Sequence, residues 1–216
     1  NMKILLFLFL LHFHFASSAQ SIIVDDPDTN LSHPEREALR KKRVNYSTNK
    51  IGVIITPPSD FNLLNRSMEA PTNASSIDYA FINKDSTVLI TIGLMARDSI
   101  DFEKDKETFK KFMPQFPNYE PNDQWIINFG ATVDSSNFRP RIYTTKLLEK
   151  FNAEGGVEYV KKKSNNLYLN KYVLERTIIL NKRFKGICEI HYFKVPSAKI
   201  RLEHEIKTAY KMIKYK

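Results

Sequence analysis

Stretches rich in apolar and β-branched residues, bounded by turn-forming residues, predict the strands of this chain. The predicted strands are Lys50–Thr56, Ile77–Ile82, Thr87–Ala96, Trp125–Val133, Arg139–Thr144, Tyr172–Leu180 and Gly186–Val195. Two neighbouring pairs are separated only by short polar segments, at 83–86 and 181–185. Strands joined by such short turns pair antiparallel, because a parallel pair needs a crossover of a dozen or more residues. The pattern therefore predicts a largely antiparallel sheet.

Apolar residues at helical spacing, together with residues typical of helix ends, predict the helices. They are expected over Ser32–Val44, Ile100–Phe112, Thr145–Phe151 and from Pro196-Ser197 through Ile213. In the last of these, one apolar stripe is formed by Leu202, Ile206, Ala209 and Ile213. The fold class that follows is α+β, with helices packed on the faces of a largely antiparallel sheet in an α/β sandwich.

The first residues have the pattern of a secretory signal peptide. Lys3 gives a short positive region, residues 4–15 are apolar, and Ser17-Ser18-Ala19 places small side chains before a cleavage site. The apolar run is too short to span a bilayer, which needs about 20 residues. We predict that residues 1–19 are removed and that the protein is exported, to the periplasm or outside the cell; a buried N-terminal helix is the alternative. Residues 20–216 are expected to form a single globular α+β domain without a transmembrane segment, with 20–32 as a loose arm.

The charge of the chain is unevenly distributed. The 216 residues include 33 Lys and Arg against 24 Asp and Glu, a net charge of +9. Residues 146–216 hold 17 basic and 7 acidic side chains, so the whole excess lies there. For an exported protein this favours an anionic glycan or a membrane surface, and not nucleic acid, as partner. The alternative is that these are ordinary solvated lysines. The lone Cys188 excludes an internal disulfide.

Two segments resemble known groups of proteins. The run KIGVIITPPSDF, residues 50–61, joins a strand to a Pro-Pro turn and an aromatic residue, and it resembles the opening of PsbP/Mog1-like domains. That resemblance covers about residues 50–214 and implies an α/β sandwich that ends in a hairpin and a helix. Tyr143 and the segment Phe151-Asn152-Ala153-Glu154 resemble uncharacterised exported proteins of Bacteroidetes, which implies export and a scaffold.

The sequence contains no nucleophile elbow, His-Glu-x-x-His zinc motif, phosphate-binding glycine loop or Cys-x-x-Cys pair. The remaining candidates for chemistry are Glu189 and His191, which period-two alternation places on one face of a strand. If Leu180 pairs with Ile187, Arg176 lies opposite His191. A carboxylate could orient this imidazole as a base or a metal ligand. The alternative is a solvated Arg–Glu pair beside an ordinary histidine, and we expect neither a metal site nor a cofactor.

A second group of candidates points to ligand binding. Asn152 and Glu154 lie on a turn and could present an amide and a carboxylate to a ligand, or the turn simply ends a helix. Tyr119 and Trp125 belong to an aromatic group that could line a pocket or form part of the core.

The sequence thus predicts an exported ligand- or partner-binding module without recognisable catalytic motifs. One alternative is a periplasmic enzyme of unfamiliar type that uses His191 and Glu189. The other is a binder of anionic glycans or membrane surfaces through the basic C-terminal third.

Overall fold

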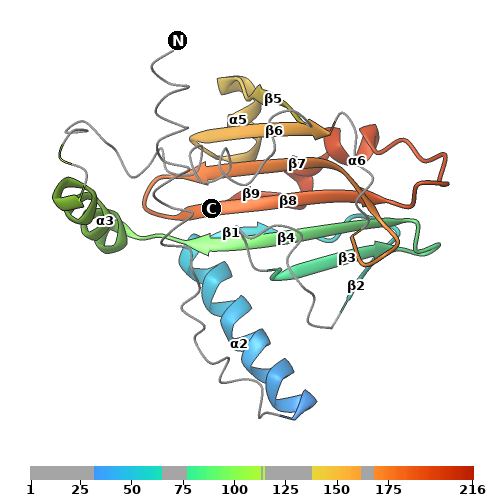
Figure 1. The fold of residues 1–216 in the computed structure, drawn as a ribbon, viewed down its shortest axis with the longest axis horizontal. Coiled ribbons are helices and arrows are strands. Elements are labelled where there is room, and N and C mark those ends of the chain that lie inside the picture. Colours follow the sequence, from blue (N-terminus) through green and yellow to red (C-terminus); the bar gives the residue numbers. More distant parts are fainter. Residues whose placement is uncertain (1–31, 65–76, 113, 115–137, 162–167) are drawn as a thin grey trace.

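A computed structural model of the chain describes residues 32–64, 77–112, 114, 138–161 and 168–216. A 7-stranded sheet forms the centre of this part, with helices and a 2-stranded sheet around it (Figure 1). The strand pairs described in both sheets are antiparallel, which confirms the predicted α+β fold class. The predicted signal peptide, the arm up to residue 31 and the predicted strand at 125–133 lie outside the described residues.

The large sheet is built from two meanders. In spatial order its strands are β2 (Phe61–Leu63), β3 (Tyr79–Asn83), β4 (Val88–Ala96), β8 (Gly186–Lys194), β7 (Val173–Lys182), β6 (Gly155–Lys161) and β5 (Phe138–Ile142). The chain passes through β2, β3 and β4, moves to the far edge at β5, and returns until β8 lies beside β4. The long pairing of β4 with β8, from Val88↔Lys194 to Ala96↔Gly186, forms the middle of the sheet. Both predicted hairpins, β3–β4 and β7–β8, are confirmed.

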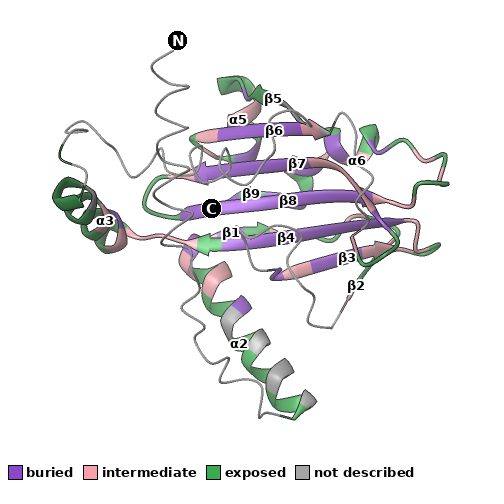
Figure 2. Cartoon of the chain, viewed as in Figure 1, coloured by how far each residue is buried: buried purple, intermediate pink, exposed green. Residues whose placement is uncertain are grey.

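One face of the large sheet, here called the core face, carries the main hydrophobic core. It packs against the small sheet and against α5 (Thr145–Phe151), α6 (Glu203–Lys207) and α7 (Ala209–Met212). The sheet contributes buried side chains that include Ile90, Ile178, Leu180, Ile190 and Tyr192. Figure 2 shows that the central strands are buried along most of their length. Alternation places the next residue of each strand on the opposite face.

The opposite face buries polar side chains among apolar ones. Leu89 and Phe193 lie at one end of it, packed with Tyr172, and Ile179 lies at the other with Val157. Between them is a row of buried polar residues: Thr91, Thr177, Glu189 and His191. This row crosses the three middle strands β4, β8 and β7. His191, the histidine candidate from the sequence, lies in it on β8.

The first helix is longer than the sequence predicts. α2 (His33–Ile51) begins after Ser32 as expected, but it passes Val44 and ends only at Gly52. Gly52 takes a left-handed φ of 69° and donates its N–H to the Thr48 carbonyl at 2.9 Å. Neither glycine nor proline occurs within residues 45–51, so Gly52 is the first strong stop signal. The predicted strand over Lys50–Thr56 is shortened accordingly to β1 (Val53–Ile55).

The prediction of one continuous C-terminal helix is wrong, but its predicted apolar stripe is buried as expected. All four stripe residues are buried, but the helix divides into α6 and α7 and gives way to β9 (Ile213–Tyr215). The hydroxyl of Thr208, between the two helices, donates to the carbonyls of His204 and Glu205. Buried Ile213 and Tyr215 then alternate with exposed lysines, a period of two that a strand satisfies and a helix does not.

The small sheet joins distant parts of the chain. β9 pairs with β1 in the register Val53↔Tyr215. The buried Tyr215 hydroxyl lies 3.2 Å from the carbonyl oxygen of Leu180 and 3.0 Å from that of Gly186. Tyr215 therefore fastens the small sheet to the β7–β8 hairpin of the large one.

The sequence pattern does not predict β6. Its first residues, Gly155-Gly156, read as a helix stop, yet they begin a strand. A Cβ atom on Gly156 would lie 2.9 Å from side-chain atoms of both Leu148 and Tyr143. Glycine at this position therefore permits α5 to pack closely on the sheet.

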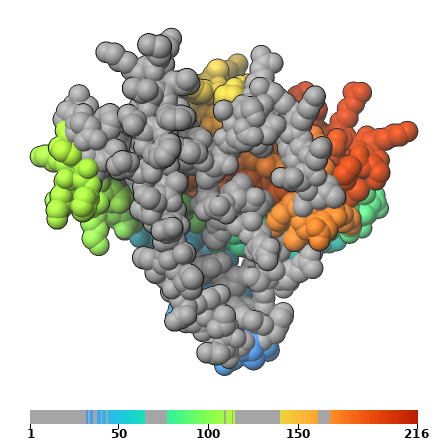
Figure 3. Space-filling view, viewed as in Figure 1, coloured from blue at the N-terminus to red at the C-terminus, as the bar shows by residue number. Residues whose placement is uncertain are grey.

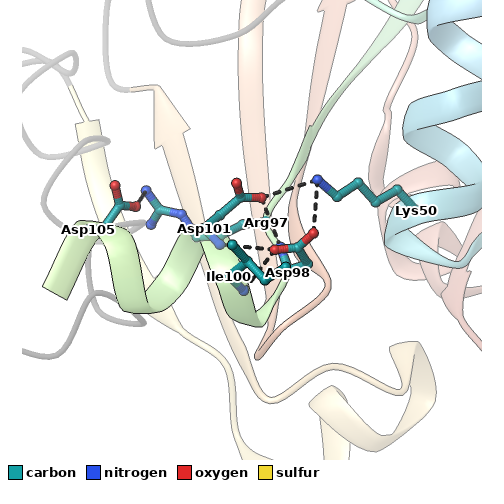
Figure 4. A network of polar contacts seen from close by, with 6 residues as sticks. All are labelled: Lys50, Arg97, Asp98, Ile100, Asp101 and Asp105. Atoms are coloured by element: carbon teal, nitrogen blue, oxygen red, sulfur yellow. Dashed lines mark hydrogen bonds and ion pairs between the residues drawn. The ribbon is translucent and has the colours of Figure 1, made fainter. Parts of the chain in front are cut away.

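A polar network holds α3 (Ser99–Phe112) to α2 (Figure 4). Asp98 accepts hydrogen bonds from the N–H groups of Ile100 and Asp101, both at 2.9 Å, and so caps the helix. The Lys50 ammonium of α2 lies 3.1 Å from the Asp98 carboxylate and 3.2 Å from that of Asp101. These carboxylates raise the pKa of Lys50. α3 lies at one side of the molecule, opposite the segment around α6 (Figure 3).

Candidate functional site

The histidine candidate lies inside the protein. His191 of β8 pairs with Thr91 of β4 on one side and Thr177 of β7 on the other. Its Nδ1 is 2.9 Å from the Thr177 hydroxyl, and its Nε2 is 3.5 Å from Oε2 of Glu189. His191 is 1% and Glu189 6% exposed. The predicted common face of these two residues is confirmed, but the solvated surface suggested as the alternative is wrong.

Arg176 does not join this pair. β7 and β8 pair Leu180 with Cys188, which differs by one residue from the predicted register. Arg176 consequently lies opposite Tyr192 and not opposite His191. Because side chains alternate between faces, a shift of one residue moves Arg176 to the core face. The expected contact of Arg176 with Glu189 and His191 is therefore wrong.

Burial limits the access of a substrate to His191 and Glu189. Nε2 of His191, Oε2 of Glu189 and Oγ1 of Thr91 have no hydrogen-bond partner among the described residues. A general base must reach a substrate proton, and both titratable side chains are almost wholly buried. Within the described ranges, no group of three His, Cys, Asp or Glu side chains could hold a metal ion. The catalytic role of His191 and Glu189 stays a prediction.

Arg176 belongs to an ionic network on the core face. The carboxylate of Glu158, in β6, is fully buried and contacts the guanidinium groups of both Arg176 and Arg141. Arg176 also lies 3.3 Å from Glu203 at the start of α6. The pKa of the neighbouring Tyr143 is raised by burial and by the Glu158 charge. The network thus connects β5, β6, β7 and α6 and supports the fold.

Asn152 and Glu154 are engaged in contacts within the chain. Asn152 takes a left-handed conformation that ends α5, and its side-chain amide donates to the Tyr215 carbonyl at 3.0 Å. Glu154 accepts a hydrogen bond from the backbone N–H of Arg183 at 3.1 Å. These two residues hold α5 against β9 and against the β7–β8 turn. The other two ligand candidates, Tyr119 and Trp125, lie outside the described residues.

Basic side chains collect where these same elements meet. The C-terminal basic surface, as we call it, consists of Lys146, Lys150, Lys182, Arg183, Lys185, Lys211, Lys214 and Lys216. The segments that carry it, 145–154, 182–185 and 209–216, hold only two acidic residues, Glu149 and Glu154. None of the eight basic side chains forms an ion pair with a carboxylate in the described part of the chain. Some described basic residues elsewhere form ion pairs, as Lys50, Arg141 and Arg176 do, whereas others, such as Lys41 and Lys42, form none.

Contacts between side chains join the elements that carry this surface. The Lys150 ammonium of α5 lies over the ring of Tyr210 in α7, 5.0 Å from its centre. Lys182 of the β7–β8 hairpin lies over the Tyr215 ring and donates to the Lys216 carbonyl at 3.3 Å. These contacts join α5 to α7 and the hairpin to β9, the four elements that carry the surface.

Sequence reasoning missed two of these features. Glu158 is a single acidic residue between Val157 and Tyr159, and its arginine partners come from other strands. In the sequence, the sign of this buried ion pair was an acidic residue between the apolar residues Val157 and Tyr159. The contribution of α5 to the basic surface was also missed, because α5 precedes the densest basic segments and joins them only in the folded chain.

Cys188 is a buried residue of the core and not a reactive thiol. Burial, and to a lesser extent the nearby Glu189 carboxylate, raises its pKa above the ordinary value. An unfolded chain releases this proton near pH 8.5, so stability should fall as pH rises beyond that point. Between pH 8 and 9.5 we expect a loss of about 1 kcal/mol from this group, measured by urea unfolding. The same pH change should cost less in Cys188→Ala; equal losses in both proteins would contradict the assignment.

Comparisons with known proteins give no match: no family model, curated protein or solved structure resembles the chain closely enough to be matched. No helix in the described ranges is long and apolar enough to span a membrane. The function of the chain is therefore inferred from its own side chains.

Proposed function

We propose that the chain is an exported binding module that docks on a polyanionic surface through the C-terminal basic surface. The observation that carries this proposal is the set of eight basic side chains without carboxylate partners in the described part of the chain. Basic residues on an ordinary surface are interspersed with acidic ones. An uncompensated group creates a positive potential that attracts polyanions and increases their rate of association.

The form of the surface supports the same proposal. Its lysines come from elements that are fixed to one another by Tyr215 and by Asn152. Because the scaffold is rigid, binding a partner orders only the side chains, and the entropic cost of association stays low. The exposed position of Lys211, Lys214 and Lys216 leaves their charges free to contact a partner.

Export is part of the proposal, and it rests on the N-terminal pattern of Lys3, the apolar residues 4–15 and the small residues up to Ala19. A location outside the cytoplasm makes anionic glycans and lipid head groups the available polyanions. The resemblance to PsbP/Mog1-like domains and to exported Bacteroidetes proteins is likewise a proposal from sequence, based on the segments at 50–61 and 143–154.

The alternative of a periplasmic enzyme retains only the pair His191 and Glu189. Both are buried, and Arg176 lies on the other face of the sheet. The binding module is therefore the better supported function.

Charge reversal within the basic surface tests the proposal. The double variant Lys211→Glu with Lys214→Glu should elute from a heparin column at a clearly lower salt concentration than the parent protein. Each lysine near an anionic surface contributes about 1 kcal/mol. Removing two should therefore weaken binding roughly 30-fold, before the repulsion of the new carboxylates is counted.

A matched control carries the same change of charge elsewhere. Lys41 and Lys42 are exposed on α2, outside the C-terminal basic surface. Lys41→Glu with Lys42→Glu should reduce heparin binding much less. If both double variants lose binding equally, only net charge matters and the proposed surface is wrong. A parent protein that does not bind heparin would also contradict the proposal.

A further inference from the structure

The tip of the β7–β8 hairpin places an exposed aromatic residue inside the C-terminal basic surface. Lys182 pairs with Gly186, and Arg183, Phe184 and Lys185 form the tip between them. The backbone N–H of Lys185 donates to the Lys182 carbonyl at 3.1 Å and closes the turn. Phe184 is 41% exposed although it is apolar. Three cationic residues, Lys182, Arg183 and Lys185, therefore flank this exposed ring in the sequence.

The ring of Phe184 is held in position by its neighbours. It meets the ring of Phe102, in α3, edge to face with the ring centres 5.1 Å apart. The Arg183 guanidinium lies 4.8 Å from the centre of the Phe184 ring and 5.2 Å from that of Phe102. Phe102 is buried, so the exposed ring rests on a fixed base. The Asp98 cap and the Lys50 contacts hold α3 itself in place.

The backbone also holds the phenylalanine at the tip. Phe184 has a left-handed φ of 58°, a conformation that bulky residues rarely adopt and that glycine adopts easily. The chain therefore keeps an apolar side chain in water at a position where glycine or asparagine is the usual residue. No acidic residue occurs within 182–185.

Resting on the proposed function, we propose that the polyanionic surface is a lipid bilayer with anionic head groups, and that Phe184 enters its interface. A bilayer provides both phosphate groups for the cations and an apolar layer for the ring. Arg183 already lies over the ring of Phe184. This leaves less of the flat face on which a sugar could stack, but it does not prevent insertion of the exposed end.

Sedimentation with vesicles tests the insertion. The full chain should sediment with vesicles of phosphatidylglycerol and phosphatidylcholine, and Phe184→Ser should bind them roughly tenfold more weakly because the apolar contribution is lost. Binding of Phe184→Ser to heparin should be unchanged, since no charge is altered. Phe184→Leu, which keeps an apolar side chain, should retain most of the vesicle binding.

Leu169 offers a matched control. It is 40% exposed and has a left-handed φ of 52°, but it precedes β7 whereas Phe184 follows it. The ten residues of β7 separate the two positions by about 33 Å. Leu169→Ser should bind vesicles as the parent protein does. An equal loss in Leu169→Ser and Phe184→Ser would overturn the assignment of the tip.

Fluorescence gives a direct measure of insertion. Trp125 is the single tryptophan of the chain, so Phe184→Trp combined with Trp125→Phe reports on the tip alone. Its emission should shift to shorter wavelength with anionic vesicles and not with heparin. An unshifted emission, or full vesicle binding by Phe184→Ser, would contradict the insertion of Phe184. It would not contradict binding through the C-terminal basic surface. Binding to heparin without binding to vesicles identifies a glycan as partner, and binding to neither contradicts both proposals.

Discussion

Replacing Gly186 with alanine should cost about 3–5 kcal/mol of folding free energy, as overpacking and a disfavoured backbone conformation act together. A Cβ atom on Gly186 would lie 2.1 Å from the carbonyl oxygen of Met95 and 3.0 Å from both Cα of Ala96 and N of Arg97. These are backbone atoms at the end of β4 and of the residue that follows it, and β4 is paired with β8 in the middle of the sheet. They cannot move without opening the pairing, and Gly186 also has a φ of 131°.

Gly52→Ala separates the two contributions. Gly52 also has a positive φ, of 69°, but the nearest atom to its added Cβ would be Cβ of Lys216, at 4.0 Å. This variant should lose only the cost of the left-handed conformation, about 1 kcal/mol. Urea unfolding of the two variants provides the measurement. Equal losses would show that the contact with Met95 is relieved by movement of the strands.

Glu158→Gln should lower the free energy of unfolding by about 3 kcal/mol, because it removes the charged carboxylate that pairs with the mostly buried Arg176 guanidinium. The Glu158 carboxylate is fully buried between Arg141 and Arg176, and the Arg176 side chain is 14% exposed. Glutamine keeps the size of the side chain but not its charge. Glu203, which is more exposed, remains as the only carboxylate that contacts Arg176 among the described residues.

A more exposed ion pair between β7, the strand of Arg176, and β8 provides the control. Glu175 lies 3.3 Å from Lys194, and its side chain is 38% exposed. Surface pairs of this kind contribute about 0–1 kcal/mol, so Glu175→Gln should be nearly neutral in the same urea experiment. Hydrogen exchange should meanwhile show that Glu158→Gln loosens β5 and α6, the elements joined by the network. A loss below 1 kcal/mol for Glu158→Gln would mean that the network contributes little.

Local sequence patterns predicted those parts of the fold whose partners are close in the chain. The two hairpins follow from strand-forming runs separated by turn residues, and α5 was predicted with its observed bounds, Thr145–Phe151. The antiparallel character of the sheet follows from the same short connections. The parts that were missed depend on distant contacts. β6 pairs with β5 and β7, and β9 needs β1, which lies far away in the sequence.

For the candidate site too, local patterns in the sequence predicted part of the arrangement, and contacts between strands determined the rest. Alternation along β8 placed Glu189 and His191 on one face, as observed, and the excess of basic residues in the C-terminal third was visible in the sequence. The register of β7 against β8 was not, because it depends on how the turn closes between Lys182 and Gly186. With Phe184 in a left-handed conformation, the pairing differs by one residue from the expected one. Because of this shift of one residue, Arg176 contacts Glu158 on the core face and does not lie beside His191.

The pairing of β1 with β9 also determines when during synthesis the domain can close. Val53 finds its partner only after Tyr215 has been made, 162 residues later. Until then the core face lacks β9, and Tyr215 cannot yet bond to Leu180 and Gly186. Contacts between residues so far apart form slowly, because the loop between them must be ordered first. The small sheet can therefore close only after residue 215 has been made, later than every strand of the large sheet.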